Sequence, residues 1–100
     1  MIHHVILWQL KDEIKEGEKA QVVADIKQNL EALVGVVPGL ISLKIVADPM
    51  PSSNADVMLD SVLENEEALK VYQTHEEHVK VADKYVRPFT KVRMCMDYKE

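Results

Sequence analysis

Three side chains between residues 72 and 78 could together carry acid–base chemistry. Tyr72, His75 and His78 follow one another at intervals of three, a spacing that brings neighbouring members to one face of a continuous helix. A neutral histidine can act as a general base, and a tyrosine hydroxyl can stabilise an enolate oxygen. The pattern therefore indicates proton abstraction next to a carbonyl group. A structural interpretation stays open, because such a tyrosine also packs in cores and histidines near helix ends also cap carbonyls.

A fourth candidate side chain, His4, belongs to a predicted strand near the N-terminus. It shares one strand face with the apolar residues Ile6, Trp8 and Leu10. A histidine on such a face must find a hydrogen-bond partner. The sequence leaves two environments open for His4: the inner wall of a pocket, or the strand end, where the ring reaches solvent or a backbone carbonyl. Separately, Trp8 and Met50 either line an apolar ligand site under a mobile loop or only fill gaps in the packing.

The sequence predicts neither a metal site nor a cofactor. In the segment HEEH at 75–78 the histidines are three residues apart, whereas a zinc-protease helix needs a spacing of four with a glutamate directly after the first. No cysteine cluster or third ligand lies near this segment in the sequence. The three glycines are also too widely spaced to form a phosphate-binding loop.

The composition predicts a single globular domain over residues 1–100. The chain is 47% hydrophobic and 29% charged, and it is too short for two independent cores. Its net charge of -5, with basic residues scattered among acidic ones, argues against a nucleic-acid partner. The N-terminus lacks a basic segment and no apolar run approaches the ~20 residues of a membrane span, so we expect a cytoplasmic protein without a membrane partner. Cys95 has no disulfide partner, and its alternation with Met94 and Met96 is typical of a packed strand.

Hydrophobic periodicity predicts a βαββαβ order. Alternating apolar residues indicate strands over 2–10, 40–46, 56–63 and 90–98. Helical spacing indicates a helix over 17–34, with Gly35 as its cap, and a second helix that begins after Asn65 and breaks near 75–78. This order is typical of a ferredoxin-like α+β fold, in which a four-stranded antiparallel sheet carries two helices on one face.

The first strand is largely apolar on both faces. Val5 and Leu7 lie opposite Ile6 and Trp8, although two helices can cover only one side of the sheet. The second face would remain exposed unless another sheet packed on it. We therefore expect a homodimer in which two sheets close into an α/β barrel.

Four short motifs resemble a known family. They are HHVILW at 3–8 running into Lys11 and Asp12, VPG at 37–39, DVML at 56–59 and YQTHEEHV at 72–79. Their order and spacing are similar to those of the stress-responsive dimeric α/β-barrel (Dabb) proteins from Ile2 to Tyr98. The resemblance implies a ferredoxin-like protomer whose sheet joins that of a twin. Similar proteins include plant stress proteins and a plant polyketide cyclase that performs an aldol condensation without a cofactor.

The resemblance also implies a site. The cyclase branch uses a histidine on the first strand, and a tyrosine and a histidine on or just after the second helix, which correspond to His4, Tyr72 and His78. Its third-strand histidine is replaced here by Val57. The proline that usually follows the first histidine of the helix motif is replaced by Glu76. We therefore expect the fold to be retained, although one histidine of the cyclase site is missing.

The sequence supports two candidate functions. The first is a homodimeric barrel protein with a small-molecule-sized cleft between sheet and helices, whose physiological role the sequence does not specify. The alternative is a cofactor-free cyclase or isomerase with His78 as base, Tyr72 as oxyanion stabiliser and His4 as supporting donor. In both, the expected ligand is a small apolar or carbonyl-containing molecule. The predicted ligand contacts are Trp8, Val57 and His75.

Overall fold

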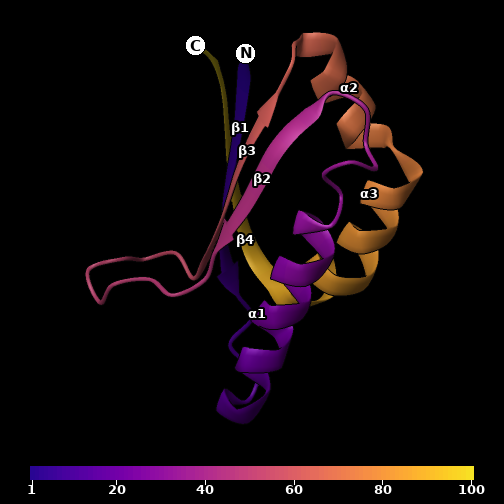
Figure 1. Ribbon diagram of the computed structural model, residues 1–100. Coiled ribbons are helices and arrows are strands. Elements are labelled where there is room, and N and C mark those ends of the chain that lie inside the picture. The colour runs from indigo at the N-terminus through magenta and orange to yellow at the C-terminus, as the bar shows by residue number, and fades with distance from the viewer.

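The computed structural model describes all residues from 1 to 100 and has the predicted βαββαβ order, with the second helical region divided into several parts (Figure 1). Its elements are β1 (Ile2–Leu10), α1 (Glu16–Glu31), β2 (Leu40–Val46), β3 (Val57–Leu63), α2 (Glu66–Thr74), α3 (Glu76–Val81), a π-helical turn (Ala82–Val86), a 3-10 turn (Arg87–Phe89) and β4 (Thr90–Lys99). The bounds of β1 and β2 agree with the prediction, and those of β3 and β4 differ from it by one residue at one end.

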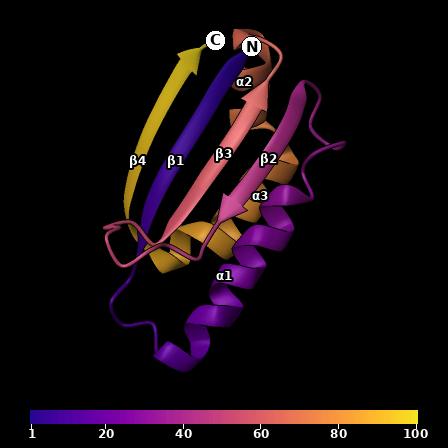
Figure 2. The same cartoon turned by 60° about the vertical axis from the view of Figure 1, so that its left-hand side comes forward.

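The four strands form one antiparallel sheet in the order β2-β3-β1-β4 (Figure 2). This order places β1 in the middle and β4 at an edge, although the two strands are the first and last of the chain. In the register of β1, His4 lies opposite Ser61 of β3 on one side and opposite Asp97 of β4 on the other. The sheet therefore brings the two ends of the sequence into direct contact.

The helix α1 packs on the sheet through one apolar stripe. Its buried residues are Val22, Ile26 and Leu30, which recur at helical spacing. The chain then turns through Gly35 and Gly39, both of which have positive φ, a conformation that favours glycine. A Cβ atom on Gly39 would lie only 2.5 Å from the Cβ of Ala68, so glycine at position 39 lets β2 start directly beneath α2.

The second helical region breaks at a single residue. Asn65 caps α2 by accepting a hydrogen bond from the backbone N–H of Ala68, as the sequence predicts. His75 has an extended backbone, ends α2, and caps α3 by accepting a hydrogen bond at Nδ1 from the N–H of Glu77. The predicted break near 75–78 is thus confirmed and lies at His75.

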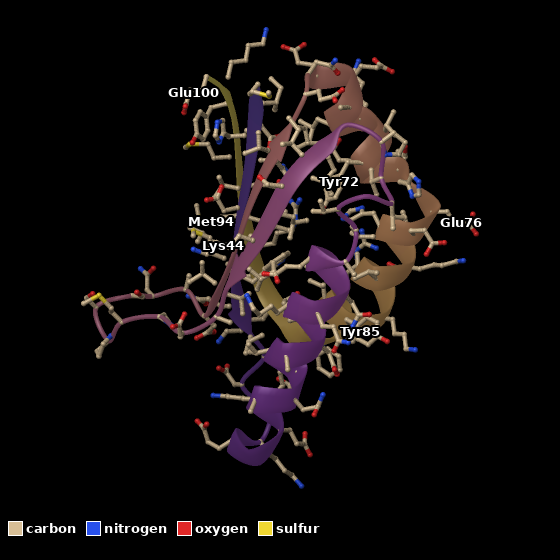
Figure 3. All side chains as sticks on the ribbon, viewed as in Figure 1. Lys44, Tyr72, Glu76, Tyr85, Met94 and Glu100 are labelled. Atoms are coloured by element: carbon tan, nitrogen blue, oxygen red, sulfur yellow. The ribbon has the colours of Figure 1, made fainter.

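The helices cover only one face of the sheet. In Figure 3, Tyr72 points into the space between sheet and helices, while Met94 lies on the opposite side of the sheet. On that open face, apolar side chains of β1 and β4 are between 38% and 69% exposed. They are Leu7, Val92, Met94, Met96 and Tyr98. The prediction of a sheet with one apolar face uncovered is confirmed. None of the helices has the length and apolarity needed to cross a membrane.

Candidate functional site

A buried histidine on β1 pairs with a carboxylate on β4. His4 is 1% exposed, and its Nδ1 forms a short hydrogen bond with Oδ1 of Asp97. The backbone carbonyl of His4 accepts a hydrogen bond of 2.8 Å from the hydroxyl of buried Ser61. When Nδ1–H donates to the carboxylate, Nε2 is the unprotonated nitrogen of the neutral ring. The pair therefore fixes the orientation of the His4 ring.

Tyr72 contributes a phenol that no protein group satisfies. Its side chain, on α2, is fully buried, and the hydroxyl oxygen has no hydrogen-bond partner. Its ring centroid lies 5.8 Å from that of His4 and 4.2 Å from that of His78. Burial raises the pKa of the Tyr72 phenol well above its ordinary value, and the charge of Arg93 opposes this effect. The phenol stays protonated and can act as a hydrogen-bond donor.

His78 contributes a second buried polar atom. It lies on α3, and its Nδ1 is buried and has no hydrogen-bond partner. Burial lowers the pKa of His78, the backbone of Gln73 opposes this effect, and the charges of Arg87, His4 and Arg93 lower the pKa further. His78 is therefore neutral at pH 7.

A small cavity of about 90 Å³ lies between the sheet and the helical region around α3. His4 and His78 both line it, together with apolar residues that include Trp8. Its remaining polar lining residues are Gln73, Arg87, Thr90 and Arg93. No carboxylate is among the lining residues, although the whole chain carries a net charge of -5. The cavity thus combines apolar walls with basic and neutral polar groups.

The structure brings together some of the predicted site residues and leaves others apart. His4, Tyr72 and His78 form one contiguous group of rings. His4, His78 and Trp8 line the cavity, whereas Tyr72 packs against the two histidines without lining it. Val57 is buried opposite Trp8 in the register of β1 and β3 but does not line this cavity. His75 does not reach it either.

The expectation that two of the residues Tyr72, His75 and His78 meet on one face of a continuous helix needs correction. The backbone of His75 is extended, with ψ 133°, so the helix does not continue through this residue. The side chain of His75 instead caps α3, and Tyr72 and His78 meet across the break. Their contact depends on the angle between two short helices and not on helical spacing.

Sequence reasoning missed Asp97 and Arg93 as site residues. Both lie on β4 on the same face as His4, whereas the methionines alternating with them lie on the open face. Period-two alternation places Arg93, Cys95 and Asp97 on one face, but only the pairing of β4 with β1 puts that face beside His4. Cys95, predicted as a packed strand residue, is exposed at the sheet edge.

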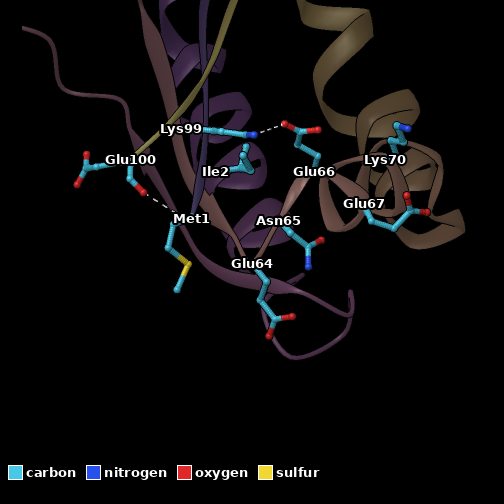
Figure 4. Close-up of a pocket in the computed structure, with 9 residues that line it drawn as sticks. All are labelled: Met1, Ile2, Glu64, Asn65, Glu66, Glu67, Lys70, Lys99 and Glu100. Carbon is cyan, nitrogen blue, oxygen red and sulfur yellow. Dashed lines mark hydrogen bonds and ion pairs between the residues drawn. The ribbon is translucent and has the colours of Figure 1, made fainter.

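A larger cavity, of about 480 Å³, lies beside both chain termini (Figure 4). Most of its lining residues are charged, and two contacts join members of this set. Lys99 Nζ lies 2.8 Å from Glu66 Oε1, and the N-terminal amine donates to the backbone carbonyl of Glu100 over 3.3 Å. Because none of its polar atoms is buried without a partner, we assign the candidate site to the smaller cavity.

The sheet order and the helices on one face define a ferredoxin-like α+β protein with a polar cavity between its two layers. A family model described as "Stress responsive A/B Barrel Domain" matches residues 2–100. The chain therefore belongs to the stress-responsive A/B barrel (Dabb) family.

Solved structures agree with this assignment. A dimeric protein of unknown function and ferredoxin-like fold from Bacteroides fragilis is 27% identical, with a TM-score of 0.91 and coverage of 99% of this chain and 95% of that one. A Dabb family protein with a ferredoxin-like fold from Mesorhizobium loti is 18% identical, with a TM-score of 0.76 over 99% and 95% of the chains.

The fold also occurs in an enzyme. A hydroxynitrile lyase from Passiflora edulis is 14% identical, with a TM-score of 0.73 over 97% of this chain and 90% of that one. At such identities the likeness shows a common fold alone. A search of curated proteins found no significant match.

Proposed function

We propose that this chain forms a homodimer through its open sheet faces and binds a small carbonyl-containing molecule in the cavity beneath α3. One observation carries the binding proposal: Tyr72 Oη and His78 Nδ1 are both buried without a hydrogen-bond partner, on rings whose centroids lie 4.2 Å apart. A buried polar group left unsatisfied costs about 1–3 kcal/mol, which is large against the ~5–15 kcal/mol that stabilises a domain. A bound polar ligand recovers this cost.

The chemistry of the walls favours a particular class of ligand. Trp8 and its apolar neighbours suit a short hydrocarbon portion. The unsatisfied phenol of Tyr72, whose ring packs against the cavity residues His4 and His78, suits a carbonyl oxygen. Arg93 lines the cavity and forms no ion pair, while Arg87 pairs with Asp83. An uncompensated guanidinium favours a carboxylate on the ligand. We therefore infer a small molecule with a ketone and a negative charge.

Pyruvate is the probe that tests this ligand class, because it carries a ketone and a carboxylate. In a titration of the full chain followed by two-dimensional NMR, we expect saturable shifts of the Trp8 indole signal and of amide signals around His78. Arg93→Gln should weaken binding at least about tenfold, because it removes a charge-assisted contact. Lys91→Gln, on the same strand but outside the cavity, is the matched control and should bind normally. Shifts confined to the surface, or equal binding by Arg93→Gln, would contradict the proposal.

The His4–Asp97 pair supports a second candidate, a cofactor-free proton-transfer catalyst. A carboxylate at Nδ1 holds a histidine ring in the orientation and tautomer that leave Nε2 able to accept a proton. In this candidate His4 Nε2 removes a proton from the carbon next to the ketone, Tyr72 donates to the enolate oxygen, and the proton then returns to carbon. This assignment exchanges the roles of His4 and His78 relative to the sequence hypothesis, because Asp97 pairs with His4.

Exchange of the methyl protons of pyruvate in D₂O, followed by NMR, distinguishes a catalyst from a binder. A catalyst should accelerate exchange above the buffer rate, and Asp97→Asn should lower the enzymatic rate at least about tenfold. Asp48→Asn, in an exposed loop, provides the matched control. Saturable binding without accelerated exchange would retain the binding proposal and exclude the catalyst.

A further inference from the structure

Three metal-ligating side chains meet where β4 pairs with β1. His4 Nδ1, Cys95 Sγ and Asp97 Oδ1 all lie within 4.8 Å of one another. Cys95 and Asp97 are two residues apart on β4 and thus project from the same face, and His4 lies opposite Asp97 in the register. Sγ lies 3.8 Å from His4 Nδ1 and 3.6 Å from Asp97 Oδ1. The set combines one imidazole, one thiol and one carboxylate.

We propose that His4, Cys95 and Asp97 form a binding site for one Zn²⁺ ion. Zinc binds sulfur at about 2.3 Å and nitrogen or oxygen at about 2.0–2.2 Å, so the donor atoms of a tetrahedral site lie about 3.3–3.6 Å apart. The two separations that involve Sγ are close to this range. Only the hydrogen-bonded atoms of His4 and Asp97 must move apart to admit the ion. Three protein ligands leave a fourth position for water or a ligand atom.

The donor set can match the charge of one divalent ion. Zinc binds cysteine as the thiolate, so a thiol ligand passes its proton to the buffer as the metal binds. The resulting thiolate and carboxylate together neutralise the charge of one divalent cation. Metal affinity should increase as the pH rises.

The metal site shares His4 with the proposed ligand cavity and would alter the chemistry of this residue. A zinc ion on Nδ1 replaces the proton that this nitrogen shares with Asp97. The second nitrogen, Nε2, must then carry the proton of the neutral ring and becomes a donor. Zinc binding and proton uptake at Nε2 are therefore mutually exclusive. Added Zn²⁺ should suppress any pyruvate exchange that the metal-free chain catalyses.

Cobalt substitution tests the site on the full chain, freed of metal and of any histidine tag. Co²⁺ should bind with one ion per chain and give the near-ultraviolet charge-transfer band of a thiolate ligand. Zn²⁺ should displace Co²⁺ and should protect Cys95 from alkylation. Calorimetric titration with Zn²⁺ should show proton release, seen as a heat that depends on the buffer.

Two variants and a control decide between this site and metal bound elsewhere. Cys95→Ser, at an exposed position, should abolish the thiolate band, and Asp97→Asn should weaken Zn²⁺ binding at least about tenfold. Asp48→Asn should bind as the parent chain does, and circular dichroism checks that each variant is folded. Absence of the thiolate band in the parent chain, or equal Zn²⁺ affinity of folded Cys95→Ser, would overturn the proposal. Neither result would affect pyruvate binding by the metal-free chain.

Discussion

At the scale of single residues, the two histidines of the cavity differ in their partners. His4 has a carboxylate at Nδ1, whereas Nδ1 of His78 has no hydrogen-bond partner. Tyr72 lies against both rings and is equally unsatisfied at its hydroxyl. The site therefore combines one carboxylate-paired histidine with two unsatisfied polar atoms, of which only that of His78 belongs to a residue lining the cavity. At Tyr72 and His78 the unsatisfied atoms should lower the stability of the ligand-free chain and, at the same time, provide contacts for a ligand.

Tyr72→Phe should separate these two effects. Removal of an unsatisfied buried hydroxyl leaves the ring packing intact and relieves a desolvation cost, so the free energy of unfolding should increase by about 1 kcal/mol. Urea denaturation of the ligand-free chain measures this change, and pyruvate titration should show weaker binding by the same variant. A loss of stability of similar size would indicate that the hydroxyl has a partner, such as a buried water.

His78 should make the stability of the chain depend on pH. Its pKa in the folded state lies below the ordinary value of 6.5, so the unfolded chain binds more protons as the pH falls through 6.5. The stabilising contribution of neutral His78 is fully present above pH 6.5 and is lost as the pH falls toward the folded-state pKa. His78→Gln should reduce the decline in unfolding free energy between pH 6.5 and about 5, a range above the ordinary carboxylate pKa values.

The matched control for this pH dependence is His75→Asn. Asparagine is a good N-cap, so this variant removes a histidine while it retains a capping side chain for α3. It should show the same pH dependence as the parent chain. If both variants reduce the decline equally, burial of His78 is not its source.

At the scale of elements, the site depends on how each helix begins and ends. Asn65 starts α2, and the extended backbone at His75 lets α3 leave in a new direction, which brings His78 against Tyr72. Gly39 brings the start of β2 close to Ala68 of α2. The position of Tyr72 over the sheet therefore depends on residues that never touch the cavity.

Gly39→Ala should be strongly destabilising. The positive φ at this position costs a side chain about 1–2 kcal/mol, and the new Cβ would also collide with Ala68. Gly35→Ala is a matched control, because Gly35 has a similar φ but open space around its Cβ position. Chemical denaturation should show that Gly39→Ala loses at least about 1 kcal/mol more than Gly35→Ala. Equal losses would mean that the close approach of α2 is easily relaxed.

At the scale of the whole molecule, the dominant feature is the contrast between the two faces of the sheet. The helix-covered face has nearly all its side chains on β1 and β3 buried, while the other face presents exposed methionine and tyrosine on β4. A contiguous apolar surface of this kind is typical of an interface. The open face and the description of the Bacteroides fragilis relative as dimeric together support the proposed homodimer.

Met94→Glu combined with Met96→Glu should convert this dimer into a monomer. Two carboxylates in the middle of an apolar interface would have to be desolvated without partners. Sedimentation velocity at micromolar concentration should give the mass of two chains for the parent and of one for the variant. Met50→Glu is the matched control, because Met50 is 73% exposed in a loop, and it should stay dimeric. A monomeric parent chain would contradict the dimer proposal.

The sequence by itself determined the elements and their order. Strand and helix periodicities are local, so the ends of β1 and β2, the cap at Asn65 and the break before α3 could all be predicted from neighbouring residues. The apolar character of both faces of β1 also sufficed to indicate that one side of the sheet needs a cover. Of the candidate site, His4, Tyr72 and His78 were identified before the structure, and they form one group.

Only the tertiary structure decided which groups act on one another. Asp97 is 93 residues from His4, and nothing in the local pattern of β4 shows that its polar face lies beside a buried histidine. That contact follows from the register of two strands at opposite ends of the chain, as does the approach of Cys95. The exclusion of His75 from the cavity depends on one backbone angle at a helix junction. Pairing and junction angles are set by the packing of the whole chain, which is why the proposed base changed from His78 to His4.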